Sequence, residues 1–358
     1  MRNTLNKIGL LFVTIVFSFF LGEIFVRVFF NQFVDSKILC AQFMNVAPYI
    51  ESSENPILRY QLKKGLETET WGLPVITDSD GCRSTTTTVE NKTNAIKIAI
   101  VGDSSAFGWG VKYETTYANL YAQKMSKETG KTVIVKNYCV PGYNTIQELE
   151  VWRTKVKQWN PDLLLIHHDN NDPEPFGITF VKDFIKPEYG NNPLHCALYK
   201  FAKRTIAKAI KKNQSRIDQT VNKTICDKTI ISEGPLYDEH VKALDSMITE
   251  AKENGTESIV ILNINYVYQE KNEEIYYKLH KPLKEHFEKN GNNVWDMYQP
   301  ALDVLKSTNQ PNTSFWWVSN KPPFDCHPNP QCHEFMAESL KEYSLKNEKI
   351  MSVFEQNA

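Results

Sequence analysis

The chain has 358 residues, of which 41% are hydrophobic and 23% charged, so it holds enough apolar material for one large core or two modest ones. Its formal net charge is −1. This balance argues against nucleic acid as a partner, because nucleic-acid binding needs a strongly basic surface. No internal repeat is visible along the chain.

An apolar segment lies close to the N-terminus, from Ile8 to Phe30. Its 23 residues are enough to cross a hydrocarbon core of about 30 Å as a helix. Glu23 and Arg27 interrupt it with an i,i+4 spacing at which they can pair on one helix face. We predict that residues 1–35 are an uncleaved membrane anchor and that the rest of the chain is periplasmic or extracellular. A cleaved signal peptide and a buried helix are the alternatives.

Seven cysteines are present, an odd number that cannot all pair within one chain. They are Cys40, Cys82, Cys139, Cys196, Cys226, Cys326 and Cys332. In an oxidising compartment Cys326 could pair with Cys332, or Cys196 with Cys226, and the sequence assigns neither disulfide. Cys139 directly follows an expected strand, and we expect it to be a buried free thiol.

Two regions lack a regular pattern. Residues 36–94 show little periodicity, and we interpret them as an N-terminal extension packed on the main domain. Within them, "VITDSDGCRS" predicts a strand that enters a tight turn at Asp80 and Gly81. Residues 177–235 are interpreted as a helical insertion. They contain Tyr199–Lys212, a helix with six basic residues whose charged face is either solvated or lies on anionic lipid.

Between residues 95 and 348, short apolar runs alternate with segments of helical periodicity. The expected strands are Ile96–Val101, Lys131–Asn137, Pro161–His168, Glu257–Asn265 and Asn292–Met297. The expected helices are Thr115–Thr129, Thr145–Gln158, Tyr237–Asn254, Tyr276–Asn290 and a last one from about Gln331. This alternation predicts an α/β domain with right-handed crossovers. We expect a doubly wound, flavodoxin-like parallel sheet of about five strands with helices on both faces.

The run Ile96–Val101 ends at Gly-Asp-Ser-Ser, which puts an acid and two hydroxyls at the carboxyl end of a strand. In an open parallel sheet, ligands bind beyond these ends. Gly102 permits a sharp turn there, so Ser104 becomes a candidate nucleophile at the sheet edge, with Ser105 as the second candidate. The alternative is that Asp103 and the serines only cap the helix that follows.

Three later segments also place polar groups at a strand end or a helix start. Gly142 follows the second strand and can offer an unhindered backbone N–H, and Asn171 follows the third and can offer an amide. Asp325 and His327 lie together in a loop before the last helix. A serine nucleophile needs a base, and the base needs an orienting acid, so Ser104, His327 and Asp325 form a candidate triad.

Four stretches together resemble the SGNH, or GDSL-like, hydrolases, and in particular their membrane-anchored bacterial members. They are "GDSSAFGWGV", "NYCVPGYNTIQELE", "PDLLLIHHDNND" and "DCHPNPQCHEFMAESL"; "DSDGCR" also resembles an upstream signature of the anchored members. The resemblance implies that Ser104 is the nucleophile and that its backbone N–H, Gly142 and Asn171 form the oxyanion hole. It implies that His327 is the base and that Asp325 orients it.

This resemblance extends from about residue 78 to residue 340 and has three departures. Asp169 stands two residues before Asn171, where the family usually has a glycine, and an inward carboxylate would disfavour an oxyanion. The acid and the base of the triad are two residues apart, whereas three is the commoner spacing. Cys332 and His333 stand where the family has a Gly-His pair.

The predicted function is hydrolysis of acyl esters, or transfer of the acyl group, by Ser-His-Asp catalysis without a metal or organic cofactor. Lipids and O-acetylated glycans are the expected substrates. A metal site of His167, His168 and Asp169 is a weaker alternative, because adjacent residues of a strand point to opposite faces. Trp109, with Trp316 and Trp317, either lines a cleft or packs in the core. Two non-catalytic alternatives remain: a carbohydrate-binding or envelope-assembly module on this fold, and a membrane-bound structural partner.

Overall fold

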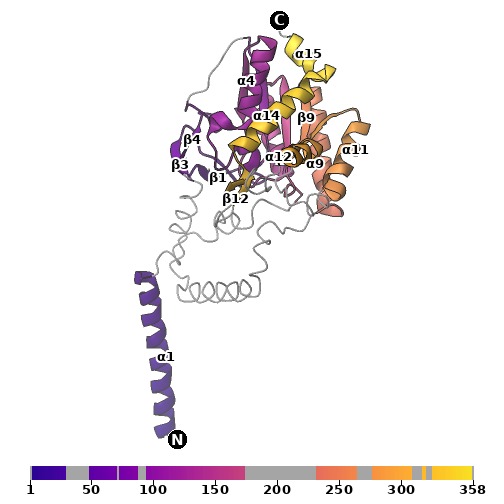
Figure 1. Cartoon of the computed structure of the whole chain (residues 1–358). Coiled ribbons are helices and arrows are strands. Elements are labelled where there is room, and N and C mark those ends of the chain that lie inside the picture. The colour runs from indigo at the N-terminus through magenta and orange to yellow at the C-terminus, as the bar shows by residue number, and fades with distance from the viewer. Residues whose placement is uncertain are drawn as a thin grey trace. The chain divides into compact units, whose positions relative to one another are not determined.

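The computed structural model describes residues 2–29, 48–70, 72–87, 94–173, 231–263, 276–308, 317–319 and 325–356. The chain forms two units, one of Met1–Pro48 with Phe180–Asp227 and one of Tyr49–Thr179 with Lys228–Ala358. Figure 1 labels the elements of each unit. The predicted basic helix, Tyr199–Lys212, and most of the predicted insertion at 177–235 lie outside the described residues.

In the first unit the described residues form the helix α1, Arg2–Phe29. Several of its large apolar side chains are exposed, for example Leu10 at 69% and Phe17 at 62%. Of the helices that the structure describes, none is both long enough and apolar enough to cross a membrane. The anchor expected at residues 1–35 is therefore not confirmed and stays a prediction.

An eight-stranded sheet forms the centre of the second unit, with the strand order β10-β9-β8-β6-β7-β5-β4-β3. The parallel strands are β6 (Ile96–Val101), β7 (Val133–Asn137), β8 (Leu163–His168), β9 (Glu257–Leu262) and β10 (Asn293–Asp296). In chain order these five lie across the sheet as 2-1-3-4-5, which is the flavodoxin-like arrangement. The predicted α/β class and doubly wound core are confirmed. The strand order reverses between β6 and β8, so ligands are expected at the ends of these two strands.

The prediction of a purely parallel sheet of about five strands is wrong, because three antiparallel strands extend it. They are β3 (Glu67–Thr70), β4 (Leu73–Thr77) and β5 (Arg83–Ser84). β5 pairs with β7 through Arg83 and Asn137. β3 reads Glu-Thr-Glu-Thr and has none of the alternating apolar residues that mark a half-buried strand. It pairs with β4 in a short hairpin that closes at Thr70 opposite Leu73, so the neighbouring strand and not its own periodicity makes it a strand.

Two smaller antiparallel pairs complete the described strands. They are β1 (Ile50–Ser52) with β2 (Tyr60–Leu62), and β11 (Trp317–Ser319) with β12 (Asp325–Pro328). The second pair is important for function, because β12 carries the candidate base His327 and the candidate acid Asp325.

The central strands are buried on both faces. Every residue of β8 is buried, and in β6 Ile98, Ala99 and Ile100 have no exposed surface. Such strands carry apolar residues at successive positions, since both faces need cover. This explains why the sequence shows continuous apolar runs here and not an alternating pattern.

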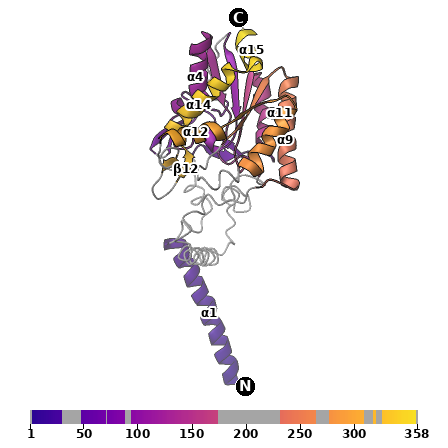
Figure 2. The ribbon, with the colours of Figure 1, turned by 45° about the vertical axis from the view of Figure 1, so that its right-hand side comes forward.

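Helices cover the two faces of the sheet. They are α4 (Tyr117–Thr129), α5 (Thr145–Val151), α9 (Pro235–Glu253), α11 (Lys281–Lys289), α12 (Tyr298–Thr308), α14 (Pro330–Leu345) and α15 (Glu348–Gln356). At the end of β8, His167 contacts Tyr117 of α4, and the next residue, His168, contacts His240 of α9. Because adjacent strand residues point to opposite faces, α4 and α9 lie on opposite sides of the sheet. Figure 2 shows the strands between α4 and α14 on one side and α9 and α11 on the other.

Three cysteines are described, and all three are buried free thiols: Cys82, Cys139 and Cys332. The free thiol expected at Cys139 is confirmed. The alternative of a disulfide between Cys326 and Cys332 is wrong, because Cys332 is free. The side chains of Cys40, Cys196, Cys226 and Cys326 lie outside the described part of the chain.

Candidate active site

The turn after β6 brings Ser104 to the end of the sheet. Gly102 makes the turn, and a Cβ at this position would lie only 2.9 Å from the Cβ atoms of Ala106 and His167. The short helix α3, Ser104–Phe107, follows directly, and Oδ1 of Asp103 accepts a hydrogen bond from the Ser105 N–H at 2.9 Å. Asp103 thus caps this helix, as expected if the acid after β6 serves as an N-cap. The cap and the candidate nucleophile Ser104 therefore lie in one turn.

His327 reaches Ser104 from a segment far along the chain. Its Nε2 lies 2.8 Å from Oγ of Ser104, within the hydrogen-bond distance that a general base requires. His327 is half-buried and Ser104 is 6% exposed, so this pair lies at the edge of the solvent-accessible surface. Ser105 is fully buried, and this disfavours it as the nucleophile.

Asp325 is the first residue of β12, and it pairs with Ser319 of β11. Its side chain lies outside the described part of the structure. The role of Asp325 as the acid that orients His327 therefore remains a prediction.

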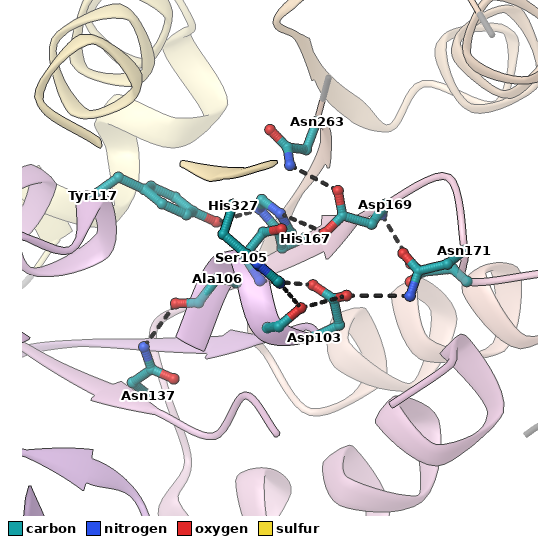
Figure 3. A network of polar contacts seen from close by, with 12 residues as sticks. Asp103, Ser105, Ala106, Tyr117, Asn137, His167, Asp169, Asn171, Asn263 and His327 are labelled. Carbon is teal, nitrogen blue, oxygen red and sulfur yellow. Dashed lines mark hydrogen bonds and ion pairs between the residues drawn. The ribbon is translucent and has the colours of Figure 1, made fainter. Parts of the chain in front are cut away.

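The two other predicted oxyanion residues lie in loops that meet the Ser104 turn. Asn171 donates a hydrogen bond from Nδ2 to Oδ2 of Asp103 at 3.2 Å (Figure 3). Gly142 has a φ of +81°, in the left-handed region that favours glycine. Its loop is joined to the turn because the Val140 N–H donates to the Gly102 carbonyl at 3.1 Å. The loop after β6 thus contacts both the loop after β7 and the loop after β8.

Asp169, the departure from the family pattern, is fully buried beside the candidate nucleophile turn. Its Oδ1 accepts a hydrogen bond from Nδ2 of Asn263 at 2.7 Å, and its Oδ2 lies 3.4 Å from Nε2 of His167 (Figure 3). The other ring nitrogen of His167, Nδ1, lies 2.7 Å from the Tyr117 hydroxyl. The extra carboxylate therefore points inward, but partners surround it.

The carboxyl groups of Asp103 and Asp169 each affect the pKa of the other. Burial, and then the charge of Asp169, raises the pKa of Asp103 well above its usual value. Burial would also raise the pKa of Asp169, but His167 and hydrogen bonds to the carboxylate lower it overall. Two adjacent buried carboxyl groups cannot both ionise at low cost. The surroundings thus favour the neutral form of Asp103 and the ionised form of Asp169.

One group among the described residues has the spacing of a metal site. Ligand atoms of Asp103, His167 and Asp169 lie within 4.8 Å of one another. The trio expected as a metal alternative, with His168 in it, is wrong, because His168 points to the other face of the sheet. The contacts of Asp103 with Ser104, Ser105 and Asn171 already account for the place of its carboxyl group. We therefore interpret Asp103 and Asp169 as a hydrogen-bonded pair of carboxyl groups, with His167 beside Asp169.

Two further acids are buried near this pair. Glu148 on α5 is 1% exposed and Asp172 in the loop after β8 is 2% exposed. Among the residues that the structure describes, neither carboxyl oxygen of Glu148 has a hydrogen-bond partner. Burial, and then the charges of Asp103 and Asp169, raises the pKa of Glu148 well above its usual value. Glu148 is thus held in its neutral form.

A histidine cluster lies on the opposite face of β8. Nε2 of His168 lies 3.0 Å from Nε2 of His240, whose Nδ1 lies 2.7 Å from the Thr145 hydroxyl. The ring of His280 meets the ring of His168 edge-on, with centroids 5.5 Å apart. Burial lowers the pKa of His240 to about 3 and that of His280 to about 4, so both are neutral near pH 7. This cluster joins α5 and α9 to the sheet.

No protein-family model matches the sequence, and no curated protein matches it either. Solved structures do match. A lipolytic protein of the G-D-S-L family from Desulfitobacterium hafniense is 13% identical, with a TM-score of 0.39, 69% of this chain covered and 99% of that one. An acetylxylan esterase mutant from Geobacillus stearothermophilus is 15% identical, with a TM-score of 0.44 and coverages of 69% and 93%. A lipase from a goat rumen metagenome is 13% identical, with a TM-score of 0.42 and coverages of 70% and 97%. The chain is similar to these proteins at a low level of identity.

Proposed function

We propose that this protein is a serine hydrolase of acyl esters, with Ser104 as the nucleophile and His327 as the general base. The observation that carries the proposal is the 2.8 Å contact between His327 Nε2 and Ser104 Oγ. It joins the turn after β6 to β12 at the switch point of a doubly wound sheet, where such folds bind ligands. A hydroxyl and an imidazole at this distance are the minimal parts of an activated serine.

In the proposed reaction, Oγ of Ser104 attacks the acyl carbonyl carbon while Nε2 of His327 takes the hydroxyl proton. The tetrahedral oxyanion accepts hydrogen bonds from the backbone N–H groups of Ser104 and Gly142 and from the Asn171 amide. His327 then gives its proton to the leaving alcohol, and the acyl group stays on Ser104. Water, deprotonated by His327, releases the acid and restores the serine.

Asn171 is suited to this role although its amide already donates to Asp103. A side-chain amide has two N–H donors, so one can hold the loop in place while the other points to the oxyanion. Asp325 completes the triad by orienting His327. The proposed catalytic set is therefore Ser104, His327 and Asp325.

We further propose an extracytoplasmic enzyme held at the membrane by residues 1–35, acting on acylated lipid or on O-acetylated glycan. Transfer of the acyl group to a sugar hydroxyl is the alternative fate of the acyl-enzyme. The exposed apolar side chains of α1 support the anchor. A chain that starts at residue 36 should stay in the aqueous phase after detergent phase separation, whereas the full chain should enter the detergent phase. Full-length protein in the aqueous phase would contradict the anchor.

Turnover of a short-chain aryl ester tests the enzymatic proposal. Ser104→Ala should abolish turnover, because the nucleophile is lost, while the thermal unfolding midpoint stays near that of the wild type. Ser105→Ala is the matched control, since it removes the neighbouring hydroxyl, and it should keep turnover measurable. Undiminished turnover in Ser104→Ala would refute the assignment.

A non-catalytic module on this fold is the second candidate, and one observation favours it. Asp169 puts a buried carboxylate next to the Ser104 turn, where the resemblance leads us to expect glycine. A module of this kind would retain glycan binding without ester turnover. Isothermal titration with acetylated and deacetylated xylo-oligosaccharides separates the two candidates, because only the enzyme consumes the acetylated ligand.

A further inference from the structure

A tryptophan lies against the candidate base. The ring of Trp109 stacks on the imidazole of His327, with centroids 5.5 Å apart and planes at 29°. Trp109 belongs to the loop that follows α3 and is partly exposed. A ring in this position can fix the orientation of the imidazole. Its electron-rich face also attracts a cation, so it interacts more strongly with imidazolium than with neutral imidazole.

The loop of Trp109 is tied to the residue that bears the nucleophile. The carbonyl oxygen of Ser104 accepts hydrogen bonds from the Gly108 N–H at 3.1 Å and from the Trp109 N–H at 3.0 Å. Any movement of Trp109 therefore also acts on Ser104. The two residues and His327 form one unit around the candidate reaction centre.

A buried arginine fixes the same loop from behind. Arg83 on β5 is 1% exposed, and its guanidinium donates hydrogen bonds to the main-chain carbonyls of Phe107, Gly108 and Val111. It also lies over the Phe107 ring, 4.5 Å from the centroid. The planar guanidinium offers several donors in one plane, and a lysine ammonium cannot reproduce that geometry. Arg83 therefore fixes the main chain on the N-terminal and on the C-terminal side of Trp109.

Gly108 shows how closely the arginine and the loop fit. Its φ is +84°, and a Cβ at this position would lie 2.7 Å from Nη1 of Arg83 and 2.5 Å from Cγ2 of Thr116. Only glycine meets both conditions, the left-handed backbone and the close approach. The main chain of this loop thus packs closely against the Arg83 guanidinium, and this packing determines the position of Trp109.

We propose that Trp109 is a positioning residue for His327, held in place by Arg83, and that its ring stabilises the imidazolium that forms when His327 takes the proton of Ser104. This inference rests on the proposed function and adds two residues to it. The signature "DSDGCR" then has a physical role, since its arginine supports the loop beside the base.

The polar surroundings of His327 allow this contribution to be measured. From α3 it faces Ser104, with the Asp103 carboxyl behind that hydroxyl. From α14 it is influenced by His333, and burial lowers the pKa of that residue to about 3, so His333 is neutral near pH 7. Asp325 shares β12 with His327, and Arg83 lies behind the loop. A substitution of Trp109 leaves every one of these polar side chains in the protein and removes only the indole ring beside His327.

Histidine NMR titration tests the proposal without relying on activity. The His327 ring signal is assigned by its loss in His327→Gln. In Trp109→Leu, the midpoint of the His327 titration should fall by about half a pH unit, because the imidazolium loses its stacking partner. Trp109→Phe keeps an aromatic face and should show a smaller fall. An unchanged midpoint in Trp109→Leu, with the fold intact by circular dichroism, would overturn the proposal.

Kinetics supply the second readout. The acidic limb of kcat/KM should move to lower pH in Trp109→Leu by the same amount, while kcat falls roughly tenfold because the base is less well oriented. Arg83→Lys should show both effects in weaker form. A uniform loss of rate at all pH values, without movement of the limb, would contradict the role of Trp109. If the wild type has no turnover, the proposed function fails, and the NMR midpoint still decides the stacking claim.

Discussion

Nδ2 of Asn171 donates a hydrogen bond to Oδ2 of Asp103, 3.2 Å away. The cap of the nucleophile helix and a candidate oxyanion donor are thereby joined across the switch point of the sheet. The same Asp103 oxygen lies 3.2 Å from the Ser104 hydroxyl. The proposed nucleophile and a proposed oxyanion donor thus both contact this carboxyl group.

Asn171→Ala should lower kcat by about 10²- to 10³-fold, which corresponds to roughly 3–4 kcal/mol of transition-state stabilisation. The physical reason is the loss of a donor to the oxyanion, while the backbone donors of Ser104 and Gly142 remain. The measurement is steady-state turnover of a short-chain aryl ester. Asn263→Ala is a useful control, because it removes a partner of Asp169 and leaves the proposed oxyanion donors in place. An equal loss in both variants would contradict a specific role for Asn171.

Gly102→Ala should lower both stability and activity. The new Cβ would meet the Cβ atoms of Ala106 and His167 at 2.9 Å, so the turn that carries Ser104 must shift. Overpacking of this kind costs about 1–3 kcal/mol in unfolding free energy. Gly130→Ala is the matched control: its φ is +68°, and nothing lies within 4 Å of the added Cβ. It should lose about 1 kcal/mol through backbone strain and keep its kcat. Equal kcat in both variants would show that the position of the turn is unimportant.

Much of the fold was predictable because its core strands are local apolar runs. The five parallel strands and the helices between them fall at the expected segments, for example β6 at Ile96–Val101 and α9 at Pro235–Glu253. Of the three antiparallel strands, β4 is the one that "VITDSDGCRS" predicts before the turn at Asp80 and Gly81, whereas β3 and β5 were missed because they are short and partly polar. β3 pairs with β4 and β4 with β5 over short stretches of chain, whereas the pairing of β5 with β7 joins segments that lie far apart in the sequence. The helices α12 and α15 were also missed.

The candidate site was predictable in part. Parallel topology brings strand ends together, and this is why Ser104 and Asn171 could be placed at one edge from sequence. The contact of His327 with Ser104 depended on the resemblance to a family as well. The acid pair of Asp103 and Asp169 was not predictable, because burial and side-chain direction decide where its proton resides. The support of Trp109 by Arg83 is likewise a matter of three-dimensional packing.

Glu148→Gln should change how stability depends on pH. The pKa of Glu148 is raised in the folded protein, so the neutral form is favoured there, and stability is lost as pH rises from the unfolded value of about 4.3 towards the folded value. In that range the wild type should lose up to about 1.4 kcal/mol of unfolding free energy per pH unit from this group. Glutamine does not titrate, so the variant should show a shallower decline. Urea unfolding between pH 5 and 8 measures it, and identical slopes would contradict a neutral buried Glu148.

The central claim is that the imidazole of His327 activates the hydroxyl of Ser104. Mapping a fluorophosphonate adduct by mass spectrometry tests this most directly, since the probe reacts with activated serines. The account predicts an adduct on Ser104 in the wild type and in Ser105→Ala, and loss of labelling in His327→Gln. No adduct on Ser104, or equally rapid labelling in His327→Gln, would contradict it.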